Sequence, residues 1–131
     1  QDTSSAASDV YKRQELEGLD NDKFSLTIKN LKFANESIKY FVEKNLKDNS
    51  TISNINKFVI LNKNFFLQPE EVVFRSLTEV LKAVGKKYYP VRGKKIDNLI
   101  YRIKNDNSFM TTLGNCVIKK VNNSVIVSKE R

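Results

Sequence analysis

Eight basic residues lie between positions 82 and 104, a stretch that contains a single acidic residue, Asp97. Its formal charge is therefore 8 − 1 = +7, compared with +8 for the whole chain. Lys and Arg gathered on one stretch can replace the counterions around a phosphate backbone, and release of these ions drives sequence-independent nucleic-acid binding. The charge distribution thus predicts a polyanion-binding surface. The basic residues are Lys82, Lys86, Lys87, Arg92, Lys94, Lys95, Arg102 and Lys104.

The same charge has two other interpretations. Lysines on a surface helix often form a solvated face that keeps a small domain soluble, and basic residues can also face an anionic membrane. Clustering favours nucleic acid, because solubilising charge normally mixes both signs, as it does from Glu15 to Glu79. Tyr88 and Tyr89, beside Pro90, would either stack on an unpaired base or pack at a helix junction.

The chain lacks the residues of most active sites. It has no histidine, which excludes Ser-His-Asp and Cys-His catalysis and every His-ligated metal site. Its four glycines are too far apart to form a phosphate-cradling loop. The one cysteine, Cys116, cannot form an internal disulfide or a zinc-binding thiolate cluster, and we expect it to be a small buried hydrophobe. We therefore predict no catalytic, cofactor-binding or metal-binding residues.

Composition favours a small folded protein without a membrane segment. A chain of 131 residues, 40% of them hydrophobic, can bury one modest core or two very small ones. No apolar run approaches the roughly 18 to 20 residues that cross a bilayer, and the start of the chain lacks the apolar core of a secretion signal. A single cysteine fits a reducing compartment. We expect a cytoplasmic protein.

The first fourteen residues differ from the rest. Residues 1–14 are rich in Ser, Ala and Asp and show no apolar period, which is typical of a disordered tail. One back-translation of residues 9–14 also resembles the transposon end sequence used to attach sequencing adapters. We therefore expect residues 1–14 to be disordered and adapter-derived, and the chain to be the tail of a longer protein.

Apolar spacing predicts three helices. A long helix follows Asp20 or Asn21 and ends at residues 48–50, with an apolar stripe that we expect to be core. A second helix begins at Gln68 or Pro69 and stops at Gly85 in a left-handed cap. A third helix runs from about residue 93 to residue 104. The stripe of the long helix consists of Phe24, Ile28, Leu31, Ile38, Phe41, Val42 and Leu46.

Alternating β-rich runs predict strands. One short strand lies around residues 58–61, and three more occupy residues 109–113, 116–121 and 124–128. Gly114-Asn115 and Asn122-Asn123 join the last three, because these residues tolerate the positive φ angles of tight hairpins. We predict an α+β fold in which a long N-terminal helix and two further helices precede a small antiparallel β-meander. Residues 15–50 would form a linker helix and residues 51–131 a C-terminal tRNA-binding α+β domain.

The order of several short motifs resembles the C-terminal part of bacterial tRNA(Ile)-lysidine synthetase, especially its alphaproteobacterial form. The resemblance covers nearly everything after Glu15. The family's tail more usually has Gly-Gly-Cys and Arg-Glu, where this chain has Gly114-Asn115-Cys116 and Lys129-Glu130. The matching motifs are Glu17-Gly18-Leu19-Asp20, Arg75-Ser76-Leu77 continuing to Val84-Gly85, Tyr89-Pro90-Val91-Arg92, Thr112-Leu113-Gly114-Asn115-Cys116 and Lys129-Glu130.

The resemblance implies part of a carbon-nitrogen ligase that uses ATP, with magnesium, to join lysine to the wobble cytidine of a minor isoleucine tRNA with a CAU anticodon. In the family this chemistry belongs to an N-terminal domain with a Ser-Gly-Gly-x-Asp-Ser pyrophosphate loop. That motif is missing here, so we expect this chain to be inactive without its catalytic domain. In the family, the C-terminal part that this chain resembles helps to bind the tRNA.

Charge and resemblance converge on one set of candidate residues, which would contact tRNA phosphates without reading the sequence. Two other functions remain open: a free-standing RNA-binding module and a protein interaction domain. The sequence also leaves open whether the intact protein forms a homodimer. The candidate tRNA-binding residues, called the basic set below, are Arg75, Lys82, Lys86, Lys87, Arg92, Lys94, Lys95 and Arg102.

Overall fold

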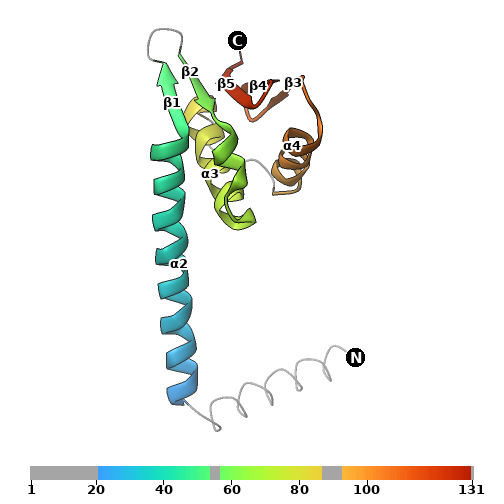
Figure 1. Cartoon of the computed structure of the whole chain (residues 1–131). Coiled ribbons are helices and arrows are strands. Elements are labelled where there is room, and N and C mark those ends of the chain that lie inside the picture. The colour runs from blue at the N-terminus through green and yellow to red at the C-terminus, as the bar shows by residue number, and fades with distance from the viewer. Residues whose placement is uncertain (1–20, 54–56, 87–92, 131) are drawn as a thin grey trace, which may run out of the picture. The chain divides into compact units, whose positions relative to one another are not determined.

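The computed structural model describes residues 21–53, 57–86 and 93–130 (Figure 1). Our predictions for residues 1–14, for Tyr88 and Tyr89 beside Pro90, and for Lys87 and Arg92 fall outside these ranges. The chain divides between Ser37 and Ile38 into two compact units, which we describe separately. The predicted α+β class is confirmed, with a long N-terminal helix, two further helices and an antiparallel sheet.

The described part of the first unit is one helix. Helix α2 spans Asn21–Asn49, as the apolar spacing predicts, and its residues up to Ser37 belong to this unit. Our expectation that its stripe is core is wrong here, because Phe24, Ile28 and Leu31 are 62%, 42% and 61% exposed. A single helix has no second layer against which to bury such a stripe.

The second unit contains a five-stranded antiparallel sheet with the order β1-β2-β5-β4-β3. The predicted meander forms β3 (Phe109–Leu113), β4 (Cys116–Val121) and β5 (Ser124–Lys129). Strand β2 (Phe58–Leu61), also predicted, pairs with β5, so that the sheet is larger than the meander we expected. The sequence did not indicate β1 (Ser50–Ser53), which pairs with β2 at the edge of the sheet.

Two tight hairpins set the register of the meander. Gly114 and Asn115 both have positive φ angles, 61° and 64°, and join Leu113 directly to its partner Cys116. Two central residues with positive φ suit the right-handed twist of the flanking strands. Asn122, with φ of 58°, begins the second two-residue turn. Both predicted turns are confirmed.

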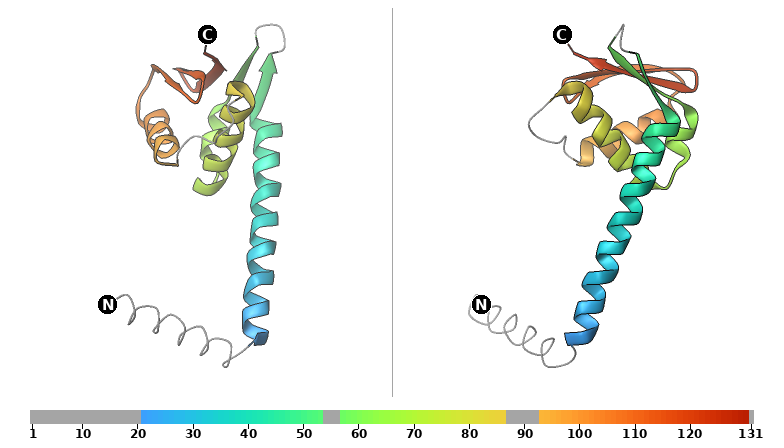
Figure 2. Two further views of the ribbon diagram at one scale, coloured as in Figure 1. Left: turned by 180° about the vertical axis from the view of Figure 1, so that it is seen from behind. Right: turned by 90° about the vertical axis from the view of Figure 1, so that its left-hand side faces the viewer.

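Two helices pack on one face of this sheet (Figure 2). Helix α3 (Glu70–Gly85) follows a short 3-10 helix, η1 (Lys63–Leu67), and helix α4 spans Gly93–Asn105. The inward faces of α3 and α4 follow from apolar residues three and four positions apart, and every one of these residues is fully or partly buried. These residues are Val73, Leu77, Val80, Leu81 and Val84 of α3, and Ile96, Leu99, Ile100 and Ile103 of α4.

The ends of α3 differ in detail from the prediction. Pro69 is the extended residue before the helix, with φ of −53° and ψ of 148°, so that Glu70 is the first helical residue. Gly85 is buried and still helical, whereas Lys86 takes the left-handed conformation, with φ of 52° and ψ of 39°. Gly85 is instead needed for close packing: a Cβ atom there would lie 2.0 Å from the carbonyl oxygen of Gly114.

The last turns of α2, from Ile38, belong to the second unit and are held by a polar side chain. Asn45 is only 3% exposed, and its Nδ2 donates to the Phe65 carbonyl at 3.2 Å and to Ser76 Oγ at 3.1 Å. Its Oδ1 accepts from Asn49 Nδ2 at 2.8 Å. The amide thereby connects α2, η1 and α3, while Val42 adds apolar contact.

Candidate nucleic-acid interface

Helix α3 and the residue that follows it carry three members of the basic set that the structure describes. Arg75 and Lys82 are seven residues apart and therefore share one side of the helix. Arg75 Nε donates to Glu71 Oε1 at 2.7 Å, four residues earlier, in an exposed ion pair. Lys86 is exposed just beyond the helix, where its N–H donates to the Lys82 carbonyl at 3.0 Å. Glu70 and Glu71, in the first turn of α3, complement the helix dipole.

Helix α4 carries three more members. Lys94 and Lys95 are exposed in its first turn, which contains no acidic residue, and the positive end of the helix dipole adds to their charge. Arg102 lies two turns along the helix from Lys95. Its Nε donates to Asp106 Oδ2 at 3.2 Å, and its guanidinium carbon lies 4.5 Å from the centroid of the Phe109 ring.

Lys95 and Arg102 meet in one hollow between α4 and β3, which we call the α4–β3 hollow. Its volume is about 200 Å³, and Asn98, Thr111 and Thr112 also line it. Two cations beside two hydroxyls and an amide provide donors for the oxygens of a phosphate. The structure therefore brings part of the basic set together around a space for an anion.

The two arginines of the basic set that the structure describes, Arg75 and Arg102, are paired with carboxylates, whereas its described lysines form no ion pair with a described residue. Both arginine pairs are about half exposed and join residues four apart on a helix. Such pairs contribute only about 0.2–1 kcal/mol. A phosphate that binds either guanidinium therefore competes with a carboxylate that is only weakly bound.

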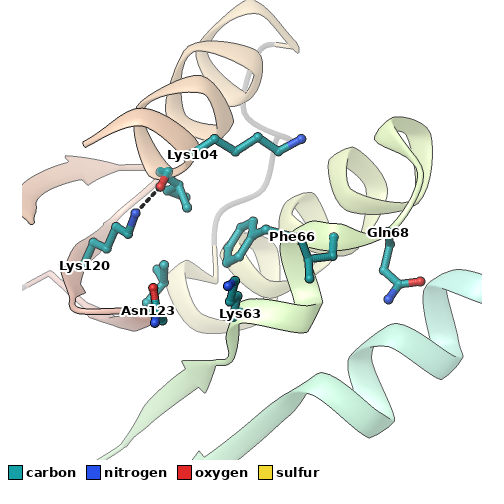
Figure 3. Close-up of a pocket in the computed structure, with 9 residues that line it drawn as sticks. Lys63, Phe66, Gln68, Lys104, Lys120 and Asn123 are labelled. Atoms are coloured by element: carbon teal, nitrogen blue, oxygen red, sulfur yellow. Dashed lines mark hydrogen bonds between the residues drawn. The ribbon is translucent and has the colours of Figure 1, made fainter. Parts of the chain in front are cut away.

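A second basic site was missed in the sequence, because its lysines come from three separate segments. The site is a pocket of about 390 Å³, called the lysine pocket, which Lys63 of η1, Lys104 of α4 and Lys120 of β4 line (Figure 3). Lys120 Nζ donates to the carbonyl oxygens of Ile103 and, at 2.7 Å, of Asp106. It thus binds carbonyls at the end of α4, whereas no described carboxylate pairs with Lys63 or Lys104.

Cys116 lies inside the core rather than at a reactive surface. The residue is fully buried, and its Sγ lies 3.4 Å from the Leu81 carbonyl oxygen. The prediction of a small buried hydrophobe is confirmed.

Residues 21–53, 57–86 and 93–130 contain no group of three or more His, Cys, Asp or Glu side chains that could hold a metal ion. Within the same ranges, no helix is both long and apolar enough to cross a membrane.

Comparison with known proteins gives two distant relatives. The chain is 22% identical over 110 residues to the tRNA(Ile)-lysidine synthase of Wolbachia sp. subsp. Brugia malayi (strain TRS), and 23% identical over 110 residues to that of Wolbachia pipientis wMel. Each alignment covers 83% of this chain but 26% of the relative, so the chain spans about a quarter of the length of the curated relatives it matches.

No protein-family model matches the chain, and no solved structure matches it. The relatives are nevertheless of the kind that the sequence motifs resemble. The chain is therefore distantly similar to tRNA(Ile)-lysidine synthases.

Proposed function

We propose that this chain is the C-terminal tRNA-binding part of a tRNA(Ile)-lysidine synthetase. The main support for this proposal is the distant similarity to two such enzymes, which extends over 83% of the chain and involves only 26% of each relative. The concentration of exposed lysines on α3 and α4 supports the same function, because a bound tRNA presents a dense array of phosphates.

The basic set would contact the tRNA backbone and would make no sequence-specific contact with the bases. Phosphate contacts fix the position and orientation of a nucleic acid but carry no sequence information. Lys82 and Lys86 would supply one group of contacts at the end of α3, and the α4–β3 hollow a second. Specificity for an isoleucine tRNA would come from other parts of such an enzyme.

The ligation chemistry would belong to a catalytic domain acting together with this chain. That domain would bind ATP and magnesium and join lysine to the wobble cytidine. The contribution of this chain is to hold the tRNA so that the anticodon reaches the site of reaction.

The salt dependence of tRNA binding tests the basic set. An isoleucine tRNA transcript with a CAU anticodon is titrated with this chain by fluorescence anisotropy at several salt concentrations. Replacement of Lys94 and Lys95 by Ala should reduce the slope of log affinity against log salt by roughly two, because each lost phosphate contact removes about 0.7–0.9 of a counterion.

A matched control removes two lysines that are outside the basic set. Lys44 and Lys47 are exposed on α2, within the second unit, beside Glu43 and Asp48. Their replacement by Ala removes the same charge and should leave the slope nearly unchanged. Equal slopes for the two double variants would contradict our assignment of phosphate contacts to α4.

The affinity and the selectivity of RNA binding together separate the proposal from its two alternatives. A part of a larger enzyme should bind this tRNA weakly and with little selectivity over other tRNAs. Tight and selective binding by the isolated chain would instead indicate a free-standing RNA-binding module. No RNA binding at moderate salt would indicate a protein interaction domain.

A further inference from the structure

The lysine pocket combines an apolar floor with a basic rim. Phe66, Ile103 and Val125 form the floor and are 7%, 3% and 1% exposed. Leu67, which is 66% exposed, lies at the edge. The volume of about 390 Å³ is within the range of about 300–1,000 Å³ that is usual for small-molecule sites.

The charge that lines this pocket has one sign. Three of its nine lining residues are lysines and none is acidic. Lys120 is already engaged with the end of α4 and keeps one of its three donor hydrogens. Lys63 and Lys104 are exposed and would therefore supply most of the attraction for an anion. Lys104 also lines a neighbouring hollow with Glu70 and Asp97, but neither carboxylate forms an ion pair with it.

Two side-chain amides add hydrogen-bonding capacity beside the floor. Gln68 Nε2 donates to the Asn64 carbonyl at 3.1 Å, which leaves the amide oxygen of Gln68 to accept from a ligand. Asn123 is exposed in the β4–β5 turn and offers both a donor and an acceptor. In Figure 3, Lys120 and Asn123 lie across a space from Phe66 and Lys63, Lys104 lies above it, and Gln68 lies farther away beyond Phe66.

We propose that the lysine pocket is a nucleotide-binding site. Lys63 and Lys104 hold the phosphate, the base lies on the Phe66 and Leu67 side of the floor, and an amide contacts the edge of the base. A flat ring on an apolar and aromatic surface, with a phosphate on ammonium groups, is a common way to hold an unstacked base. The site shares no residue with the basic set and is separate from the phosphate contacts proposed above.

The nucleotide has two possible sources, a free mononucleotide or an unpaired nucleotide of an RNA. Adenosine 5′-monophosphate represents the first, and the single-stranded oligonucleotide hexa-adenylate represents the second. Adenosine provides the base and ribose without the phosphate, and inorganic phosphate provides the phosphate without the base. Each of these four probes is added to the ¹⁵N-labelled chain, and amide shifts are followed by NMR spectroscopy.

We expect adenosine 5′-monophosphate to shift the amides of Phe66, Leu67 and Asn123 and to bind at least tenfold more tightly than adenosine or phosphate. Shifts at these amides with hexa-adenylate alone would also support the site and would identify RNA as its source. An absence of such shifts with both nucleotide probes would overturn the proposal.

Single substitutions then separate the phosphate from the base. Replacement of Lys63 or Lys104 by Gln should weaken binding of the mononucleotide roughly two- to fivefold, as loss of an exposed charge contact does. Leu67→Ser should weaken binding of the mononucleotide and leave binding of inorganic phosphate unchanged. Because all three side chains are exposed, these variants should fold normally.

The control is Lys119→Gln, which removes one charge next to Lys120. Lys119 is exposed on the opposite face of β4, because successive side chains of a strand alternate between faces. Lys119→Gln should change the affinity for the mononucleotide by less than twofold. Equal losses for Lys119→Gln and Lys104→Gln would overturn the proposal, as would equal affinities for phosphate and mononucleotide.

The outcome is distinct from that of the proposed function. Ala at Lys94 and Lys95 should weaken tRNA binding without altering the response of the pocket to the mononucleotide. Failure of the chain to bind tRNA, with the mononucleotide still shifting the amides of Phe66, Leu67 and Asn123, would support the nucleotide site. That result would contradict the assignment of tRNA contacts to the basic set.

Discussion

Helix α3 and residues 21–37 of helix α2 have similar apolar spacing and opposite environments. Leu77 of α3 is fully buried between the sheet and the other helices of its unit, whereas Leu31 of α2 is 61% exposed. Both sequences contain apolar residues every three or four positions, and both segments are helical. The spacing therefore predicts that a helix forms, and burial depends on whether a second layer covers it.

The largest expected effect compares one leucine from each helix. Leu77→Ala should lower the free energy of unfolding by about 2–5 kcal/mol, because it removes buried methyl groups and leaves a cavity. Leu31→Ala should change the free energy by less than about 0.5 kcal/mol, as exposed substitutions usually do. Urea unfolding followed by circular dichroism measures both. A cost for Leu31→Ala close to that of Leu77→Ala would mean that residues 21–37 are covered in solution.

A smaller effect is expected where α3 approaches the β3–β4 turn. Gly85→Ala would place a Cβ atom 2.0 Å from the Gly114 carbonyl oxygen and 3.1 Å from Cys116 Sγ, so the helix or the turn must shift. We expect a loss of about 1–3 kcal/mol, the usual cost of overpacking. The same substitution at Gly93, whose added Cβ would lie 3.4 Å from the Phe74 ring, is the matched control.

Gly93→Ala should be neutral or stabilising, because alanine restricts the unfolded chain and favours the helix. Thermal unfolding of the two variants checks the comparison. A melting temperature for Gly85→Ala equal to that of Gly93→Ala would contradict close packing at Gly85.

Local patterns predicted the parts of the fold whose causes are local. The inward faces of α3 and α4 follow from spacing, and both hairpins follow from residues that accept positive φ angles. Strand β1 is different: Ser50, Thr51 and Ser53 have no apolar alternation, and their extended form depends on pairing with β2. Strands β2 and β5 pair residues that are far apart in the sequence, Phe58 with Ser128 and Leu61 with Val125, and this pairing requires the complete fold.

The same distinction applies to the candidate sites. Lys95 and Arg102 are seven residues apart on one helix, so their meeting in the α4–β3 hollow follows from helical geometry. The lysine pocket draws its cations from η1, α4 and β4, and only tertiary packing brings them together. Charge density along the sequence therefore indicated the first site and could not indicate the second.

The last stability effect is similar in size to that of Gly85→Ala and concerns the end of α2 that belongs to the second unit. Asn45→Ala should lower the free energy of unfolding by about 1–3 kcal/mol, because it leaves the buried Phe65 carbonyl and Ser76 hydroxyl without this donor. Asn35→Ala, in the exposed part of the same helix, is the control and should be near neutral. Equal unfolding midpoints for the two variants would show that the amide of Asn45 does not hold α2 to the core. A selective loss for Asn45→Ala would show that a buried polar side chain, which apolar periodicity does not predict, secures this end of the helix.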